Sequence, residues 1–268
     1  MSATQSGSFG DLLRYWRNAR KMSQLAVAVE AEVSTRHVSF VETGKSTPSR
    51  DMVLLLADVL EVPLRDRNTL LQAAGYAPAY RETSLDAPEL RDVRRGIEFM
   101  LEHHNPYPAI LVDRHWNLLL QNRAASALFP LFVADASALT TPLNTMRLLF
   151  DPRGFRPFIT NWEEIAVAMV QRLHAEVALT QDATLRQLLE ELLSADDVPK
   201  AWRVPDYGAE RPLLVSTRLR RGTEELELYT ALTTLGTPLD ITLHELRLET
   251  FFAANEATDR AIRRLVAS

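Results

Sequence analysis

"VSTRHVSFVETGKSTPS", residues 33–49, predicts a short helix, a turn and the start of a second helix. Ser34 is a suitable N-cap, because its side-chain oxygen can accept a hydrogen bond from an amide of the first turn. Val38 and Val41 fall on one side of this helix, and Gly44 suits the left-handed residue that ends it. The polar side chains therefore gather at the amino-terminal end of the helix, opposite a small apolar face.

Outward from this segment, the spacing of apolar residues predicts four more helices in the first 80 residues. They begin near Phe9, Ser23, Pro48 and Pro63. In the helix after Pro48 we expect a buried stripe of Met52, Leu55, Leu56, Val59 and Leu60. The first part of the chain is therefore predicted to be an all-α, five-helix domain.

The pattern Ser23-Gln24, Ala31-x-Val33-Ser34, Val38-Ser39 and Val41-Glu42-x-Gly44 resembles the helix-turn-helix of the lambda-repressor/Cro-like (XRE) family. The resemblance covers most of residues 10–76 and implies a domain that binds double-stranded DNA. Glu32 departs from the family pattern, in which the turn residue is often glycine. A positive φ at a non-glycine residue there would cost of order 1 kcal/mol.

A recognition helix enters the major groove with the side chains of its amino-terminal end. Arg36 can donate two hydrogen bonds to a guanine edge, and Thr35 and His37 can reach bases or phosphates. Gln24 and Ser34 lie at helix amino termini, where the backbone amides favour the binding of a phosphate. The predicted DNA-binding residues are Gln24, Ser34, Thr35, Arg36, His37, Ser39, Lys45 and Arg50.

Composition and charge agree with a small basic module on an acidic body. The chain has 268 residues, a net charge of -5, 46% hydrophobic and 24% charged residues, and no cysteine. Residues 11–50 contain seven basic and four acidic side chains, whereas residues 81–268 contain 21 basic and 27 acidic ones. The lack of cysteine suits a reducing cytoplasm, and we see neither a secretion signal nor a membrane span in the sequence.

Residues 75–84 interrupt the helical periodicity with glycine and prolines, so we place a domain boundary there. The predicted domains are 1–81, a helix-turn-helix domain, and 82–268, a ligand-binding domain. Two strands flank a turn at 114–116, and Asn122 caps a helix after them. Helices follow, and alternation of period two then predicts three late strands within 213–220, 225–230 and 245–252. A five-stranded antiparallel sheet in an α+β domain is therefore expected.

The opening of this domain, two strands followed by an Asn-capped helix, resembles PAS sensory domains. Residues 144–150 and 158–164, NTMRLLF and FITNWEE, resemble the ligand-binding domain of MmyB-like transcription regulators. In that family the domain follows a lambda-repressor-like module, as here. The resemblance implies a PAS-like fold that binds a small apolar molecule, with a fatty acid as the leading candidate.

A fatty-acid carboxylate would require a cation, and Arg147 and Arg218 are the two candidates. Both are also expected as ordinary surface or ion-paired arginines. Aromatic residues of the domain are expected as core first and as ligand contacts second. The predicted ligand-binding residues are Trp116, Arg147, Phe150, Trp162 and Arg218.

No phosphate-binding glycine loop, zinc-protease motif or nucleophile elbow occurs in the sequence, so no catalytic residue, metal or required cofactor is predicted. The sequence predicts a transcriptional regulator that binds DNA, acts as a homodimer on paired half-sites and senses a small apolar ligand. Two alternatives stay open. The second domain could be a dimerisation or protein-interaction module without a ligand, or, with less support, an enzyme tethered to DNA.

Overall fold

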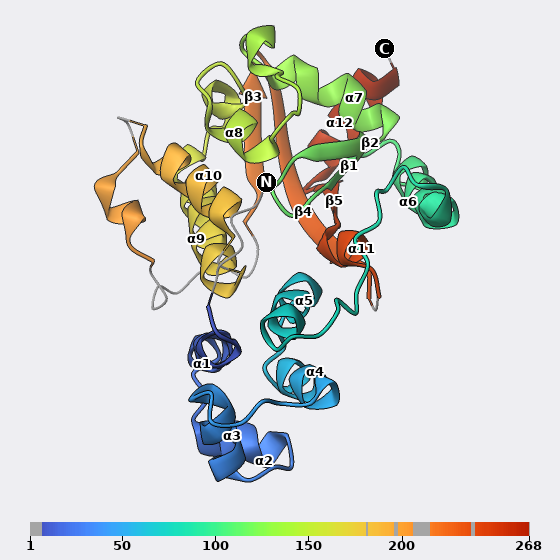
Figure 1. The fold of residues 1–268 in the computed structure, drawn as a ribbon. Helices are drawn as coiled ribbons and strands as arrows, with labels where there is room; N and C mark the ends of the chain where they lie inside the picture. Colours follow the sequence, from blue (N-terminus) through green and yellow to red (C-terminus); the bar gives the residue numbers. More distant parts are fainter. Residues whose placement is uncertain (1–6, 181, 196–197, 206–214, 237–238, 268) are drawn as a thin grey trace. The chain divides into compact units, whose positions relative to one another are not determined.

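The computed structural model describes residues 7–180, 182–195, 198–205, 215–236 and 239–267. These residues form two compact units, and most of the first is the chain up to Glu82 (Figure 1). The first unit is helical, and the second combines helices with one antiparallel sheet. The predicted fold class, an all-α domain and an α+β domain, is confirmed. None of the described helices has the length and apolar character needed to cross a membrane.

Serine side chains start the helices of the first unit. Its helices are α1 (Phe9–Ala19), α2 (Gln24–Glu30), α3 (Thr35–Glu42), α4 (Arg50–Val59) and α5 (Leu64–Ala73). The residue before each of the first four is a serine whose Oγ accepts a backbone amide of the first turn, at 3.0–3.3 Å. Ser23 and Ser34 are thus confirmed as caps, each satisfying an amide that has no partner within its helix.

Each of these five helices ends with one residue in the left-handed conformation. The five residues are Lys21, Glu32, Gly44, Glu61 and Gly75. After each of them, the next amide donates to a carbonyl five residues earlier, at 2.8–3.0 Å, which is the Schellman geometry. A side chain with a Cβ adopts this conformation at a cost of about 1–2 kcal/mol. Three of the five helix ends therefore carry backbone strain.

Replacing Glu32 with glycine is expected to stabilise the first unit by about 1 kcal/mol, because glycine adopts a positive φ without the Cβ clash. Glu32 has a φ of 53°. The measurement is the hydrogen-exchange protection of amides in α1 to α5 of the full chain. Gly44→Ala is the matched control with the opposite expected sign, since Gly44 has a φ of 70° and an added Cβ would meet no atom within 4 Å. Lower protection in Glu32→Gly would contradict the strain at this turn.

The buried stripe of α4 differs from the predicted one. Val53, Leu56, Ala57 and Leu60 are completely buried, whereas Leu55 is 40% exposed. The prediction for Leu55 was therefore wrong. A leucine is more hydrophobic than an alanine, so hydrophobicity alone favoured the face of α4 that contains Leu55 over the face that contains Ala57. The small side chain of Ala57 suits close packing of α4 against its neighbours.

The carboxylate of Glu42 is fully buried among α1, α2 and α3. Arg17 donates to its two oxygens from Nε and Nη2, at 2.6 and 3.2 Å. Gln24 donates to it at 2.7 Å, and Arg14 Nε lies 3.8 Å from Oε2. Gly10 permits close approach, since a Cβ there would lie 2.3 Å from the Glu42 carbonyl oxygen. The end of α3 is thus fixed to α1 by a buried, hydrogen-bonded ion pair.

The second unit is built on a five-stranded antiparallel sheet with the order β2-β1-β5-β4-β3, as predicted in type and strand number. The strands are β1 (Ala109–Val112), β2 (Leu118–Gln121), β3 (Thr217–Arg221), β4 (Glu224–Thr234) and β5 (Arg247–Ala253). Residues 213 and 214 of the predicted third strand lie outside the described residues. Because the first and last strands of the chain pair, residues far apart in sequence share the centre of the sheet.

Helices cover both faces of this sheet (Figure 1). The outer face, as we call it, carries α6 (Arg91–His103) and α11 (Ile241–Glu245). The inner face carries α7 (Arg123–Leu128), α8 (Thr145–Phe150), α9 (Trp162–Thr180), α10 (Ala183–Leu193) and α12 (Glu256–Ala267). Short 3-10 helices lie at Pro88–Leu90, Phe129–Phe132, Ala136–Ala138, Arg156–Phe158 and Lys200–Arg203. Asn122 caps α7, as predicted, by accepting the amide of Ala125 at 2.9 Å.

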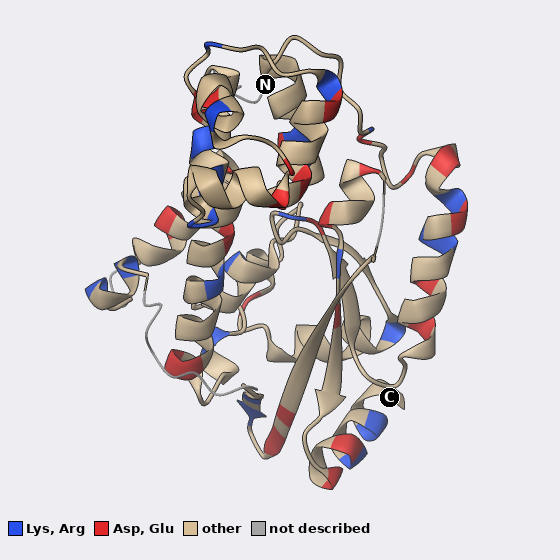
Figure 2. Ribbon diagram, turned by 90° about the horizontal axis from the view of Figure 1, so that it is seen from below, with Lys and Arg blue, Asp and Glu red and all other residues tan. Residues whose placement is uncertain are grey.

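The central strand β5 is covered on both faces. Leu248 packs with Leu111 on the outer face, so the alternating residues Arg247, Glu249 and Phe251 point to the inner face. Leu226 and Leu228 of β4 share this inner face with Phe251. Charged residues therefore occur within the sheet as well as along the helices (Figure 2).

Candidate functional site

The amino-terminal end of α3 presents the predicted DNA-reading residues. Ser34 accepts the amide of His37 at 3.1 Å, and Thr35 and Arg36 are exposed on the first turn. His37 and Ser39 are half-buried, and His37 Nε2 is a buried atom with no hydrogen-bond partner. This helix end thus offers a guanidinium and a hydroxyl, and it contains a buried imidazole nitrogen without a hydrogen-bond partner.

Phe40 is a residue of this surface that the sequence did not suggest. The Arg36 guanidinium lies 5.0 Å and the Lys45 ammonium 5.7 Å from the centre of its ring. Such cation–π contacts at exposed sites contribute roughly 0.5–1 kcal/mol. Phe40 therefore restricts the positions of two cations. The signal in the sequence is the spacing of Arg36 and Phe40, four residues apart on one helix face.

The remaining predicted DNA contacts fall into two groups. Gln24 is half-buried, and its side-chain amide is used in the hydrogen bond to Glu42. Lys45 and Arg50 are exposed. Neither of them, nor Arg36, forms an ion pair with any residue that the structure describes. Three uncompensated positive charges are therefore contributed by α3, the turn after it and the first turn of α4, which suits phosphate binding.

The predicted aromatic ligand contacts lie in the interior of the second unit. Trp116 and Phe150 are buried, and Trp162 is half-buried. The rings of Phe150 and Trp162 meet edge to face at 5.0 Å, and the Arg156 guanidinium lies 4.6 Å from the Trp162 ring. Trp116 has a positive φ of 68°, which is rare for so large a side chain.

The two predicted head-group arginines belong to separate ion pairs. Arg147 on α8 donates to both carboxylate oxygens of Glu191 on α10, each at 2.8 Å. This bidentate hydrogen bond raises the pKa of Arg147 and lowers that of Glu191. Arg218 on β3 donates to Glu227 on β4 at 3.2 Å. The structure therefore does not bring the two arginines into one pocket.

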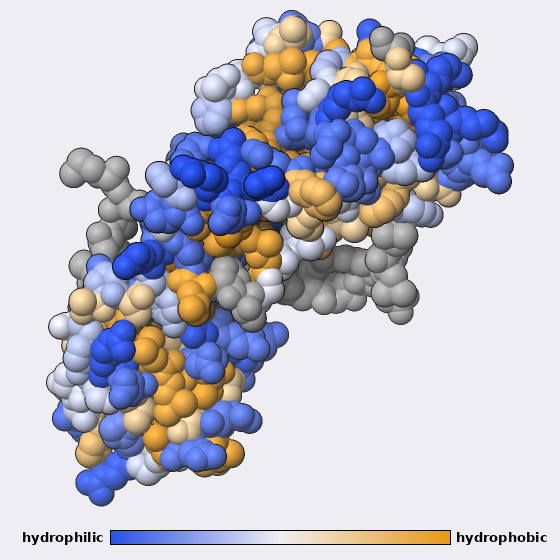
Figure 3. Space-filling model, turned by 90° about the vertical axis from the view of Figure 1, so that its right-hand side faces the viewer, coloured by the Kyte–Doolittle hydropathy of each residue, from blue (hydrophilic) through white to orange (hydrophobic). Residues whose placement is uncertain are grey.

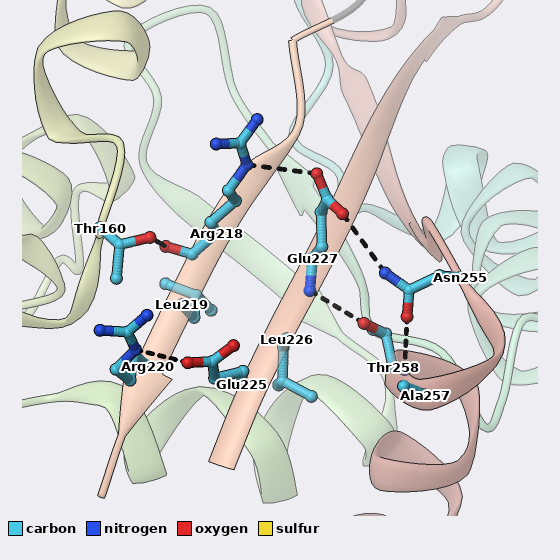
Figure 4. Close-up of a pocket in the computed structure, with 10 residues that line it drawn as sticks. All are labelled: Thr160, Arg218, Leu219, Arg220, Glu225, Leu226, Glu227, Asn255, Ala257 and Thr258. Atoms are coloured by element: carbon cyan, nitrogen blue, oxygen red, sulfur yellow. Dashed lines mark hydrogen bonds and ion pairs between the residues drawn. The ribbon is translucent and has the colours of Figure 1, made fainter. Parts of the chain in front are cut away.

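Arg218 lines a cavity of about 320 Å³ at the end of β3 and β4 (Figure 4). Its lining consists of Thr160, Arg218, Leu219, Arg220, Glu225, Leu226, Glu227, Asn255, Ala257 and Thr258. The two arginines of this cavity each form an ion pair. Arg218 pairs with Glu227, and Arg220 contacts Glu225 at 2.7 Å. The Ser216 hydroxyl donates to Glu227, and this hydrogen bond is the largest cause of the lowered pKa of that carboxyl. The cavity is thus polar and charge-balanced, a poor match for an alkyl chain.

A second cavity, of about 470 Å³, lies between α9, α10 and the 3-10 helix at 200–203. Leu189 and Leu193 give it an apolar side, and its polar lining is His174, Arg186, Glu190, Ser194 and Arg203. Among the described residues, no cluster of three or more His, Asp or Glu side chains could hold a metal ion.

A charged cluster on the inner face of the sheet was missed by the sequence reading. Two guanidiniums contact the Trp116 ring, with Arg172 at 4.9 Å and Arg247 at 4.8 Å from its centre. Glu176 accepts hydrogen bonds at 3.1 Å from Arg172, Arg247 and the Trp116 indole. In the sequence, Arg247 and Glu249 alternate with Leu246 and Leu248, which is the pattern of a strand with one solvated face. In the fold, α9 packs over that face, which the alternation pattern does not show.

Glu249 lies beside this cluster, and burial raises its pKa to about 7, although Arg172 and Arg247 act in the opposite direction. Because the folded pKa exceeds the ordinary value of 4.5, the protonated carboxyl supports folding fully below about pH 4.5. That contribution is lost as the pH rises through about 7.

Glu249→Gln is therefore expected to raise the thermal stability of the second unit at pH 8–9 and to change it little at pH 5. The measurement is the melting temperature of wild type and variant at several pH values. Glu225→Gln is the control, because Glu225 lies in an exposed pair on β4, and no such pH dependence of the difference is expected there. An equal effect of Glu249→Gln at all pH values would contradict the raised pKa.

Two family models match this chain. The model described as the MmyB-like transcription regulator ligand binding domain matches residues 93–265, and a helix-turn-helix model matches residues 13–66. The first match alone spans more than half of the chain. Both resemblances seen in the sequence are thereby confirmed.

The chain is also similar to a protein of Bacillus subtilis (strain 168) described as "Uncharacterized HTH-type transcriptional regulator RghRB". The two are 35% identical over 95 residues. The aligned region covers 35% of this chain and 62% of the relative, so the similarity spans less than two thirds of that protein's length.

Proposed function

Because this chain belongs to the family of MmyB-like transcription regulators, we propose that it binds operator DNA through α3 and controls transcription in response to a small ligand. The ligand would be held by the second unit and would favour one DNA-binding state over another. A ligand with equal affinity for both states would shift nothing.

The observation that carries the DNA-binding role is the exposed guanidinium of Arg36, which forms no ion pair with a described residue and lies on the first turn of a serine-capped helix. A guanidinium in this position can make two hydrogen bonds to guanine in the major groove. Lys45 and Arg50, also without ion pairs in the described part of the chain, would contact phosphates on either side. A homodimer on paired half-sites suits this geometry, and both the dimer and a cytoplasmic location stay predictions.

For the ligand we propose an amphiphilic acid, with a fatty acid as the first candidate. Between the inner face of the sheet and the helices over it lie two apolar clusters that share four side chains, which supports an alkyl chain as the ligand's main part. Each buried CH₂ group would contribute roughly 0.8 kcal/mol, so a dozen of them offset the cost of association.

Two measurements test this proposal. The first selects chromosomal fragments with the purified full chain at modest ionic strength, and enrichment of a shared sequence is expected. The second extracts the purified protein and identifies bound lipids by mass spectrometry, where a carboxylic acid in stoichiometric amount is expected. Absence of enrichment, with and without added lipid, would reject the regulatory role.

A protein-interaction role is the second candidate, and exposed apolar side chains favour it. Leu25 and Val29 on α2 are 61% and 66% exposed, and Phe99 on α6 is 63% exposed. Figure 3 shows apolar patches among polar areas on one side of the molecule. Protein that retains no extractable lipid but binds DNA and associates with a partner through Phe99 would favour this role.

A further inference from the structure

The interior of the second unit contains a seam between two clusters of buried residues. Four side chains pack against both clusters: Leu149, Trp162, Met169 and Phe251. Each of them stays half-buried, although core positions of this kind are usually closed completely. The seam is therefore a part of the interior where side chains are not fully enclosed.

α9 and β5 face each other across the seam. Along each of them, apolar side chains lie at one end and charged side chains at the other. Along α9, Trp162 and Met169 come before Arg172 and Glu176, at spacings that place all four on one helix face. Along β5, which faces this part of α9, Phe251 is separated by two-residue steps from Glu249 and Arg247. Contacts of Glu176 with Arg247 place the two polar ends together. The seam thus has an apolar end and a charged end, which is the shape of an amphiphile's site.

The two guanidiniums at the charged end have unused donors. Arg172 donates to Glu176 only from Nε, and Arg247 only from Nη1. Their other N–H groups donate to no residue in the part of the chain that the structure describes. The Glu249 carboxylate likewise accepts no hydrogen bond from a described side chain. Each guanidinium can therefore still form charge-assisted hydrogen bonds with an added carboxylate.

We propose that Arg172 and Arg247 bind the carboxylate of an amphiphilic monocarboxylic acid, and that its alkyl chain lies along the seam toward Trp162. This assignment rests on the proposed ligand-sensing function and places the head group away from both Arg147 and Arg218.

Charge balance makes this binding depend on a proton. Above about pH 7, the charges of Arg172 and Arg247 are balanced in the free protein by those of Glu176 and Glu249. A ligand carboxylate would add a third negative charge, so Glu249 takes up one proton from solvent on binding. The charged groups that face Glu249 are Arg172 and Glu176 on α9 and Arg247 on its own strand. Its neighbours on the paired strands, Ile110 and Leu232, carry no charge.

The proton uptake is tested by measuring the affinity of the full chain, freed of lipid, for dodecanoate at several pH values from 7 to 9. Wild-type affinity is expected to fall about tenfold per pH unit, since one proton is taken up with each ligand. Glu249→Gln is expected to bind with an affinity that does not change over this range and exceeds that of wild type at pH 9. A pH-independent wild type, or a variant that keeps the wild-type slope, would overturn the proton uptake.

The location is tested with arginine variants at pH 7. Arg172→Gln is expected to weaken dodecanoate binding at least tenfold, and Arg260→Gln, which alters a highly exposed pair on α12, should leave it unchanged. Dodecanol, which lacks the charge, should bind wild type and Arg172→Gln equally. Loss of binding on Arg147→Gln or Arg218→Gln, with Arg172→Gln unaffected, would move the head group elsewhere and leave the sensing function intact. A wild type that binds neither dodecanoate nor a copurified lipid would overturn the site and the sensing function together.

Discussion

Glu42→Ala is expected to destabilise the five-helix unit by about 3–5 kcal/mol, the range for breaking a buried ion pair from one side. The variant would leave the Arg17 guanidinium facing a space from which water is largely excluded, and Gln24 would lose its acceptor. Since the lost carboxylate joins α1, α2 and α3, the whole unit should loosen together. The second unit has its own core and should keep its stability.

Hydrogen exchange followed by mass spectrometry on the full chain separates the two units. Amides of α1 to α5 are expected to lose protection in Glu42→Ala, while those of the sheet do not. The double variant Arg17→Met, Glu42→Leu is the control, because replacing both charges by apolar groups restores much of the stability in buried pairs. If the double variant were as unstable as the single one, the Gln24 amide left without its acceptor, rather than the unpaired charge, would explain the loss.

Arg36→Ala is expected to weaken binding to the selected operator by about 1–3 kcal/mol, roughly a factor of 5 to 150, and to relax the preference for one base. Non-specific binding should change little, because this guanidinium is assigned to a base edge. The side chain is exposed and stacks on Phe40, so the substitution removes no buried contact and the fold should be unaffected.

Arg50→Ala is the matched control for this experiment, since Arg50 is also exposed and without an ion pair among the described residues. Loss of a phosphate contact should weaken specific and non-specific binding alike and reduce the slope of log K against log salt by about 1. If Arg36→Ala behaved in the same way, Arg36 would be a phosphate contact and the base-reading assignment would be wrong.

Local signals in the sequence were enough for most of the first unit. The serine caps and the helix-ending Gly44 act within a few residues, so they could be identified without knowledge of the packing. The departure from glycine at Glu32 left the geometry of that turn open, and the structure gives Glu32 the positive φ of the family's glycine turn. The error in this unit was the choice of the buried face of α4, because that choice depends on the helices that pack against it.

The second unit shows the limit of such signals. Its three late strands follow from alternation, but alternation does not tell whether a polar face meets water or another layer. Arg247 and Glu249 look solvated in the sequence, although α9 covers them and supplies Arg172 and Glu176 as partners. Phe40 was missed for a similar reason, because its role depends on two cations that come together only in the fold.

The left-handed ends at Lys21, Glu32 and Glu61 give the DNA-binding unit a route to new operators. Thr35 and Arg36 are exposed, so a lineage could exchange them with little cost to folding. Substitutions deeper in α3 would cost more, and glycine at any of the three strained ends could offset that cost from a distance, since effects at separate sites usually add. The DNA sequence that the unit recognises can therefore change without a loss of its folding stability.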